Sequence, residues 1–235
     1  MDLMKPSILG PHAPPKLAVP QMHVRVRPGA ALGSFRRARV RAMMTAPGVT
    51  RAVIAPGNGG GPTGIRDANF YGWVADALQA GGMDAVVRDM PDPYVASEKV
   101  WVPFLRDTLR CGADTVLVGH SSGAAAGLRL AEEVRLGGLV LVSAYATDLG
   151  DAMERQAGYF TRPFDWDKIR ANCGFVVQFG SPDDPFLPWD AQCEVAEGLG
   201  ITITRLDGRG HFMEPTFPEL VNAIQARASS ARPRE

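Results

Sequence analysis

Residues 116–123, Val-Leu-Val-Gly-His-Ser-Ser-Gly, join an apolar run to a turn built from glycine and serine. The run is short and continuous, as in a strand buried within a parallel sheet, and residues 122–133 after it are small enough for a closely packed helix. A serine between the two lies on a strained turn that presents its hydroxyl at the end of the sheet. Gly119 and Gly123 let the strand and helix backbones pass without a clash. The stretch makes Ser121 a candidate nucleophile, and a purely structural turn at a sheet edge is the alternative.

The rest of the chain repeats this alternation of strand and helix. Each expected strand is a continuous apolar run, and each expected helix has an apolar face at helical spacing. The expected strands are 52–55, 85–87, 115–118, 139–142, 175–179 and 201–204, and the expected helices are 70–79, one that begins at Ser97, 122–133 and 218–228. Such strands indicate a parallel sheet covered on both faces, with right-handed crossovers. Together with the serine turn, the pattern predicts an α/β-hydrolase fold with a six-stranded, mostly parallel sheet in the order 2-1-3-4-5-6.

The composition is that of an ordinary soluble domain. The chain has 235 residues, 46% of them hydrophobic and 21% charged, which suffices for one domain with a substantial core. Its formal charge of zero gives no indication of nucleic-acid binding, and no apolar run is long enough to cross a bilayer. Three cysteines without metal-ligand spacing favour a reducing compartment and no disulfide framework. We therefore expect a soluble intracellular protein that binds no nucleic acid, metal or cofactor and does not insert into membranes.

Residues 1–50 differ from the rest of the chain. They hold eight basic side chains against one acid and are rich in proline, whereas residues 51–235 carry a net charge of about −7. Arginine-rich, acid-poor composition is typical of organelle transit peptides, and a disordered tail or an unused start codon are the alternatives. We expect a leader at 1–50, an α/β-hydrolase domain at 51–228 and a flexible tail at 229–235. The expected location is the cytoplasm or, if the leader is a transit peptide, a mitochondrion or plastid.

A serine hydroxyl needs a general base to become a good nucleophile. The chain has four histidines, of which His12 and His23 lie in the leader and His120 lies inside the serine turn. His211 follows the last expected strand, where an α/β-hydrolase carries its histidine. Elimination and position therefore both predict His211 as the base.

The acid that orients this histidine is expected between the serine and the histidine in the chain. Residues 180–188 follow the fifth expected strand and contain two neighbouring carboxylates. Residues 184–188, Asp-Pro-Phe-Leu-Pro, fit the usual loop pattern of aspartate, two residues, an aliphatic residue and proline. Asp184 is therefore predicted as the acid, with Asp183 as the first alternative and Asp207 as a weaker one.

Negative charge that develops on a substrate carbonyl oxygen needs hydrogen-bond donors already in place. The first expected donor is the backbone N–H of Ser122, the residue after the nucleophile. The second is expected from the glycine-rich loop 56–61 after the first strand, at Asn58 and Gly59. A phosphate-binding loop is the rival interpretation, but the lysine and Ser/Thr of a P-loop are missing.

Longer motifs run in order through about residues 51–225. They are 56–61 (PGNGGG), 71–74 (YGWV), 90–93 (MPDP), 119–123 (GHSSG), 141–145 (LVSAY), 158–163 (GYFTRP), 178–181 (QFGS) and 183–189 (DDPFLPW). In these motifs the chain resembles the small serine hydrolases of the retinoblastoma-binding protein nine family. The resemblance implies a compact α/β-hydrolase fold without a large cap domain. It also implies serine hydrolase activity in which Ser121, Asp184 and His211 have the three roles given above.

One departure from the family concerns its namesake interaction, which is associated with a Leu-x-Cys-x-Glu motif. The matching stretch, 109–113, reads Leu-Arg-Cys-Gly-Ala, so Ala113 stands where the motif has glutamate. Retinoblastoma-protein binding should therefore not be carried over to this chain.

Residues 145–173 lie between two expected strands and are longer than one helix requires. Aromatic side chains gather there. Phe160, Phe164 and Trp166, with His120 beside the nucleophile, are expected to line the acyl pocket as a wall or short lid. The alternative is that the aromatic residues pack a helix onto the sheet.

Two functions are compatible with these residues. In the first, the protein hydrolyses an ester or amide bond of a small substrate through an acyl-serine intermediate. In the second, it is an interaction protein on the same fold with little or no catalytic activity. All three residue types of a catalytic triad occur in a workable order, which favours the hydrolase.

Overall fold

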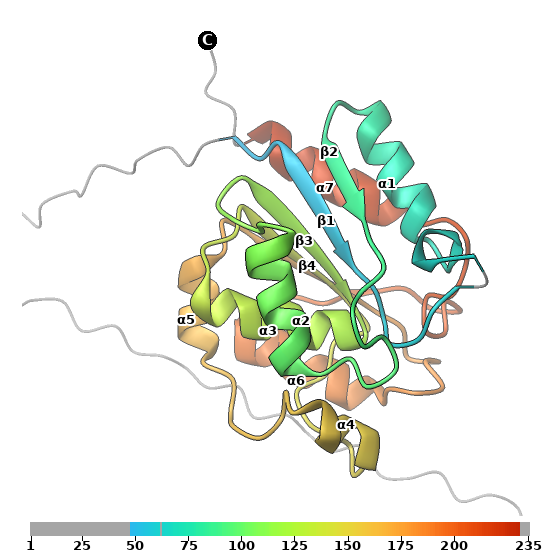
Figure 1. Cartoon of the computed structure of the whole chain (residues 1–235), viewed down its shortest axis with the longest axis vertical. Coiled ribbons are helices and arrows are strands. Elements are labelled where there is room, and N and C mark those ends of the chain that lie inside the picture. The colour runs from blue at the N-terminus through green and yellow to red at the C-terminus, as the bar shows by residue number, and fades with distance from the viewer. Residues whose placement is uncertain (1–47, 62, 231–235) are drawn as a thin grey trace, which may run out of the picture. The chain divides into compact units, whose positions relative to one another are not determined.

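Six parallel strands form the sheet. The computed structural model describes residues 48–61 and 63–230, and every strand pairing in it is parallel (Figure 1). The strands are β1 (Arg51–Ala55), β2 (Asp84–Val87), β3 (Thr115–His120), β4 (Gly138–Val142), β5 (Val176–Gly180) and β6 (Thr204–Arg205). Their order is β2-β1-β3-β4-β5-β6. The predicted fold class and strand order are confirmed.

The last strand is shorter and starts later than expected. The sequence predicted it at 201–204, but β6 covers only Thr204–Arg205, beside the end of β5. The amide of Ile201 donates to the carbonyl of Ala196 over 3.0 Å and so closes the end of the preceding helix. An amide engaged in this way is not available to a strand ladder.

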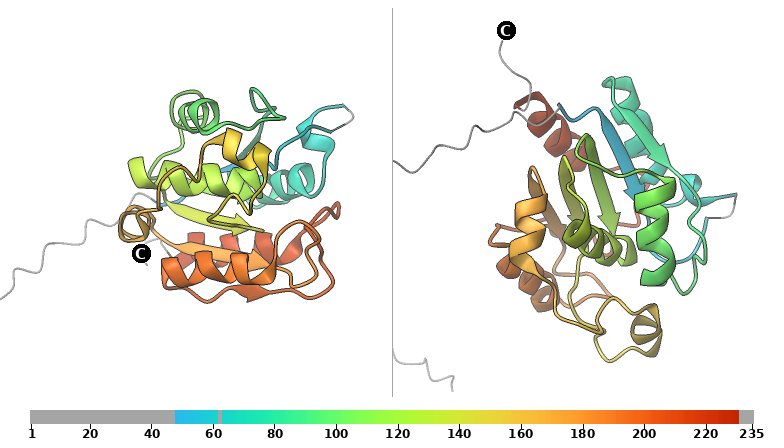
Figure 2. Two further views of the ribbon diagram at one scale, coloured as in Figure 1. Left: turned by 90° about the horizontal axis from the view of Figure 1, so that it is seen from below. Right: turned by 60° about the vertical axis from the view of Figure 1, so that its left-hand side comes forward.

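Helices cover both faces of the sheet (Figure 2). They are α1 (Tyr71–Ala80), α2 (Glu98–Pro103), α3 (Ser122–Glu133), α4 (Ala152–Ala157), α5 (Trp166–Asn172), α6 (Trp189–Leu199) and α7 (Pro218–Ser230), with a 3₁₀ turn η1 (Ile65–Asp67) and a π-helical turn η2 (Phe104–Thr108). Residues of α1 and α7 belong to one core cluster, and residues of α2, α3, α5 and α6 belong to the other. Because both faces are covered, β3 and β4 are buried along their whole length.

Three of these helices, α4, α5 and α6, were not in the sequence prediction. Two of them begin at aspartates whose side chains accept backbone hydrogens: Asp151 from Met153 and Glu154, and Asp165 from Lys168. An aspartate at a helix start is a sequence signal, but helices of six and seven residues carry too little periodicity to be recognised. The segment between β4 and β5 holds only α4 and α5, in agreement with the expectation of no large cap domain.

The expected bounds of the leader and the tail lie near the ends of the described residues. The expected leader, 1–50, lies outside the described residues except for 48–50. Helix α7 continues to Ser230, so residues 229–230, which were expected in the tail, are helical, and 231–235 lie outside the described residues. Within the described ranges no helix combines the length and the hydropathy that a membrane span requires.

The serine turn brings backbones into contact and yields a test of the fold. A methyl group on Gly123 would lie 2.2 Å from the carbonyl oxygen of Ala55. Backbone atoms cannot move aside as side-chain ends do, so we expect Gly123→Ala to lower the free energy of unfolding by more than about 3 kcal/mol. Gly127→Ala in the same helix is the matched control, because its nearest contact is the side-chain end of Leu139 at 3.2 Å. Urea denaturation measures both; equal stabilities would contradict this packing.

Candidate active site

A cavity of about 690 Å³ opens where the parallel strands end. Its volume is within the range of small-molecule sites, and its position at the carboxyl ends of the strands is usual for ligand sites in α/β sheets. The lining residues are Gly57, Asn58, Asn69, Tyr71, His120, Ser121, Tyr145, Leu149, Asp151, Met153, Glu154, Pro185, Phe186, Leu187, His211 and Met213. The predicted nucleophile Ser121 and the predicted base His211 therefore line the same cavity.

Ser121 lies on a strained turn between β3 and α3. Its backbone has φ +53° and ψ −119°, a left-handed φ that residues with a side chain rarely adopt. The Ser121 amide donates to the carbonyl of Val142 in β4 over 3.0 Å, and α3 begins at the next residue. The surrounding sheet and helix hold this conformation, which is the one expected of a nucleophile at a strand-to-helix turn.

His211 and Asp184 are hydrogen-bonded to each other. The Nδ1 of His211 lies 2.8 Å from Oδ2 of Asp184. A carboxylate only accepts, so Nδ1 carries the hydrogen, and Nε2 is the basic nitrogen of the neutral imidazole. Phe186 stands edge-on to the imidazole with ring centres 5.0 Å apart, which restricts the positions the ring can take.

The carboxylate of Asp184 accepts four hydrogen bonds. Its Oδ1 accepts from the amides of Phe186 (2.9 Å) and Leu187 (3.1 Å), and its Oδ2 accepts from the Ser143 hydroxyl (2.9 Å) as well as from His211. Burial by itself raises the pKa of Asp184, but the hydrogen bond and charge of His211 and the two amides bring it below its usual value. The carboxylate is therefore ionised at neutral pH, as the stabilisation of an imidazolium requires.

Ser143 is a residue of this site that sequence reasoning missed. It follows β4 in a left-handed conformation, φ +47°, and its amide donates to the carbonyl of Phe179 over 3.1 Å. Its hydroxyl donates to Asp184. A single serine after a strand has no pattern of its own, and only its place in the motif 141–145 could have drawn attention to it.

Asp183, the first alternative acid, has a different set of partners. It accepts from the Ser181 hydroxyl (2.6 Å) and from the amides of Gly208 (2.9 Å) and Gly210 (3.1 Å). The bond from Ser181 contributes most to the lowered pKa of Asp183, and the two amides add to it. These contacts anchor the loop that carries His211.

Asp207, the second alternative, is exposed, and its Oδ1 accepts from Nε of Arg205 over 2.8 Å. Its carboxylate is therefore paired with a surface guanidinium, whereas that of Asp184 contacts the imidazole of His211 directly. The geometry favours Asp184 over both alternatives.

The expected oxyanion donors differ in their surroundings. Ser122 is the first residue of α3, so its amide is one of the N–H groups that have no partner inside the helix, at the positive end of the helix dipole. Asn58 lines the cavity. Gly59 is not among the lining residues, and its amide donates to the carbonyl of Pro93 over 2.6 Å. The prediction for Gly59 is therefore wrong.

The expected aromatic wall is also wrong. Phe160, Phe164 and Trp166 do not line the cavity and instead pack against the core cluster around α3. The guanidinium of Arg129 lies 3.7 Å from the ring centre of Phe164. Trp166 packs so closely on Gly198 of α6 that a methyl group there would lie 2.5 Å from the indole. The three rings have the packing role that the alternative interpretation gave them.

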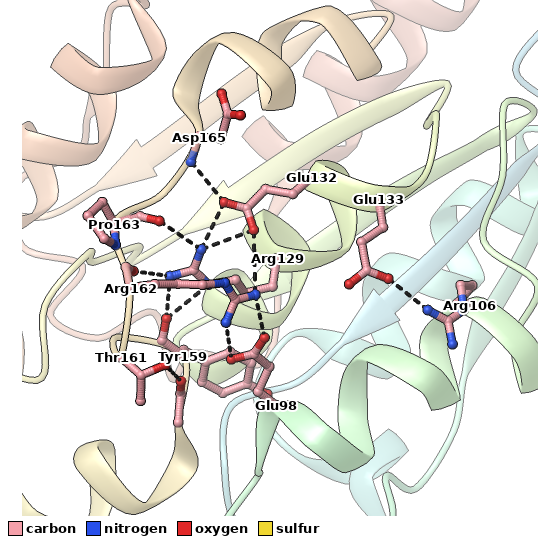
Figure 3. A network of polar contacts seen from close by, with 11 residues as sticks. Glu98, Arg106, Arg129, Glu132, Glu133, Tyr159, Thr161, Arg162, Pro163 and Asp165 are labelled. Carbon is pink, nitrogen blue, oxygen red and sulfur yellow. Dashed lines mark hydrogen bonds and ion pairs between the residues drawn. The ribbon is translucent and has the colours of Figure 1, made fainter.

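Arg129 accounts for the position of this aromatic segment. Its side chain is 1% exposed and donates to the carbonyls of Tyr159 (2.9 Å), Arg162 and Pro163 (3.2 Å) (Figure 3). Glu132, one turn further along α3, accepts from Arg129 over 2.8 Å. These bonds satisfy the carbonyls of an irregular segment and hold it against α3, away from the cavity.

Other side chains form the cavity wall. Tyr145 donates from its hydroxyl to Oε2 of Glu154 over 2.7 Å, and burial raises the pKa of that glutamate. We call the exposed apolar side chains that line the cavity the apolar rim: Leu149, Met153, Phe186 and Met213. The residues of the wall on and near α4 could not be recognised from periodicity, because that helix is too short.

His120 lines the cavity, as predicted, but almost all of its side chain is buried. It is 1% exposed, with Nδ1 2.6 Å from the Tyr71 hydroxyl and Nε2 2.9 Å from the carbonyl of His211. Burial, and then the charge of His211, lower the pKa of His120 to about 3. His120 is therefore neutral at the base of the cavity.

Within 48–61 and 63–230, no group of three or more histidine, cysteine or acidic side chains is arranged to hold a metal ion.

Sequence comparison relates the chain to known hydrolases. A family model for serine hydrolases matches residues 61–217. Serine hydrolase RBBP9 of the rat (Rattus norvegicus) is 47% identical over 183 residues, which cover 77% of this chain and 97% of the rat protein. This identity confirms the resemblance inferred from the motifs.

Structural comparison agrees on the fold. The crystal structure of the ydeN gene product of Bacillus subtilis has a TM-score of 0.69 at 24% identity, over 77% of this chain and 99% of that chain. The crystal structure of XCC1541, a protein of the alpha/beta superfamily from Xanthomonas campestris, has a TM-score of 0.52 at 16% identity, over 79% of this chain and 98% of that chain. At such identities the likeness concerns the fold, which is that of the α/β-hydrolases.

The buried, neutral His120 predicts a pH dependence of stability. Its pKa is about 3 in the folded protein against 6.5 for a free imidazole, so the unfolded chain binds more protons below pH 6.5. We expect the free energy of unfolding to fall as the pH is lowered from about 7 to about 5, by up to about 1.4 kcal/mol per pH unit.

Urea denaturation of the wild type and of His120→Asn across this range measures the effect. The variant should show the weaker dependence on pH. The carboxylates with lowered pKa values titrate below this range. Parallel pH curves would contradict the assignment of a neutral, buried His120.

Proposed function

The chain belongs to the serine hydrolase family, and from this we propose that it hydrolyses an ester or amide bond with Ser121 as nucleophile, His211 as general base and Asp184 as orienting acid. The observation that supports these roles most directly is the 2.8 Å contact between His211 Nδ1 and Asp184, beside a cavity that Ser121 and His211 both line. With Nδ1 engaged, Nε2 is the nitrogen that takes the serine proton.

In the first half of the reaction, Oγ of Ser121 bonds to the carbonyl carbon, and its proton moves to Nε2 of His211. Asp184 holds the tautomer that accepts this proton and stabilises the imidazolium. The amides of Ser122 and Asn58 donate to the negative substrate oxygen. When the tetrahedral intermediate collapses, the bond to the leaving group breaks, and the imidazolium gives its proton to the departing alcohol or amine.

In the second half, water attacks the acyl-serine and passes a proton to His211. The bond between the acyl carbon and Ser121 then breaks, and the imidazolium returns the proton to the serine oxygen. The products are the free acid and the enzyme in its original state, so no further reactant is needed.

The cavity wall indicates the kind of substrate. A volume of about 690 Å³ suits a small molecule, and the apolar rim offers contact to an apolar part of it. Asp151, an exposed acidic residue of the wall near α4, would repel an anionic group. We propose a small ester or amide without a negative charge close to the scissile bond.

The proposal does not extend to retinoblastoma-protein binding. Besides the missing glutamate, Leu109 and Cys111 are only 6% and 4% exposed. A recognition segment must present its side chains to the partner, and these two belong to the hydrophobic core.

Replacing the nucleophile tests the proposal. Ser121→Ala should abolish labelling by a fluorophosphonate probe and reduce turnover of a model ester by about 10⁶-fold, while the fold is kept. Ser97→Ala, which removes a serine outside the cavity, should label like the wild type. Labelling that persists in Ser121→Ala would overturn the assignment. A wild type that neither labels nor turns over any ester or amide would favour an interaction protein instead.

The two neighbouring aspartates should respond differently to replacement by asparagine. Asp184→Asn should reduce kcat by about 10⁴-fold, because it favours the wrong imidazole tautomer. Thermal stability should change little, because both backbone amides donate to Oδ1 of Asp184, and the asparagine oxygen can accept from both. Asp183→Asn should mainly lower stability, because Gly208 and Gly210 donate to different oxygens of Asp183, and an asparagine side chain keeps only one of these acceptors. Kinetics and thermal denaturation of both variants measure this. A larger loss of kcat in Asp183→Asn would move the acid to that residue.

A further inference from the structure

The hydroxyl of Tyr71 and the imidazole of His120 form a buried hydrogen-bonded pair at the base of the cavity; each residue is 1% exposed. The Nε2 of His120 lies 2.9 Å from the carbonyl oxygen of His211. A carbonyl only accepts, so Nε2 carries the hydrogen, and in a neutral imidazole Nδ1 is then an acceptor. Tyr71 therefore donates its only hydroxyl hydrogen to His120, over 2.6 Å.

The lone pairs of the Tyr71 oxygen accept two further hydrogens. One comes from the backbone amide of Gly57 (2.9 Å) and the other from the side-chain amide of Asn69 (3.2 Å). Because its own hydrogen is already donated, Tyr71 cannot also donate to a substrate oxyanion. All the bonds thus run in one direction, from the Gly57 amide through Tyr71 and His120 to the carbonyl of His211.

This path joins two loops that the sheet does not hold together. Gly57 follows β1 and His211 follows β6, and three strands separate β1 from β6 in the sheet. A methyl group at position 57 would lie 3.4 Å from Cβ of Ser121, so this loop passes directly against the nucleophile. The neighbour of Gly57 is Asn58, the proposed oxyanion donor. One end of the path is therefore next to the proposed oxyanion donor, and the other end is the main chain of the proposed base.

We propose that Tyr71 and His120 are positioning residues for hydrolysis: together they fix the main chain of the oxyanion loop relative to the main chain of the general base, on either side of Ser121. The inference rests on the roles proposed for Ser121 and His211. Displacements of about 1 Å between reacting groups can cost about 100-fold in rate, and these bonds limit that displacement. The cavity wall near α4 and the apolar rim lie outside the path, so substrate binding should depend on it little.

Tyr71→Phe tests this proposal, because it removes the hydroxyl and keeps the ring. We expect kcat to fall by about 10- to 100-fold while KM changes by less than about threefold. The second-order rate constant for fluorophosphonate labelling of Ser121 should fall by the same factor as kcat. A tyrosine that only stabilises the fold would leave both quantities unchanged below the melting temperature.

Tyr159→Phe is the matched control. Tyr159 is 0% exposed and donates from its hydroxyl to the carbonyl of Ala96 over 2.7 Å, but it does not line the cavity. This variant also loses a buried hydroxyl and one hydrogen bond, and its kcat should match the wild type. Equal kcat in Tyr71→Phe and wild type, or equal losses in the two tyrosine variants, would overturn the proposal.

A second pair of variants decides the question if Tyr71→Phe does not fold. Glutamine at position 120 can both accept and donate, whereas methionine can replace neither bond. We expect His120→Gln to keep a kcat at least about tenfold above that of His120→Met. Equal kcat values would contradict the proposal. Activity that survives in Ser121→Ala would refute the proposed function itself, whereas an inactive Ser121→Ala beside a fully active Tyr71→Phe would refute only this inference.

Discussion

The close approach of β3, α3 and the end of β1 is the constraint on which the rest of the site depends. A methyl group on Gly119 would lie 2.4 Å from the carbonyl oxygen of Gly123, and one on Gly123 would lie 2.2 Å from that of Ala55. Three backbones thus meet at contact distance, and Ser121 has no room to relax from its φ of +53°. The same approach sets the loop after β1 directly against the serine. One packing arrangement therefore fixes both the proposed nucleophile and the proposed oxyanion loop.

The histidine, by contrast, lies on a loop that needs separate support. Its imidazole is held by Asp184, its carbonyl by His120, and the glycine amides just before it by Asp183. Asp183 and Asp184 are neighbours in the loop after β5, so a single segment anchors both the side chain of the proposed base and the main chain next to it. This division explains why two adjacent carboxylates occur where orientation of the imidazole alone requires one.

The fold and the proposed triad were accessible from sequence because each depends on a local signal. Continuous apolar runs predict buried strands, and Gly-x-Ser-x-Gly between such a run and a helix predicts the serine turn. The sixth strand was misplaced because the amide of Ile201 completes α6, a competition that a run of β-branched residues does not reveal. Gly59 was misassigned because its amide is engaged by Pro93, which lies far away in the sequence. Ser143 and Tyr71 were missed as contact residues because their partners, too, are distant in the chain.

The aromatic residues after α4 show why composition alone could not place the cavity wall. The rings of Phe160 and Phe164 suit a pocket and a core equally well. The contacts of Arg129 on α3 with this segment place both rings at the core. Burial lowers the pKa of this guanidinium, and its ion pair with Glu132 is by itself weak evidence for stability. Arg129 also donates to three carbonyls of a segment that has no regular hydrogen bonding of its own, and each of those carbonyls would otherwise be costly to bury. The buried guanidinium therefore acts mainly by donating hydrogen bonds to main-chain carbonyls. These bonds keep the segment against α3, so residues around α4, not the aromatic rings, form the cavity wall.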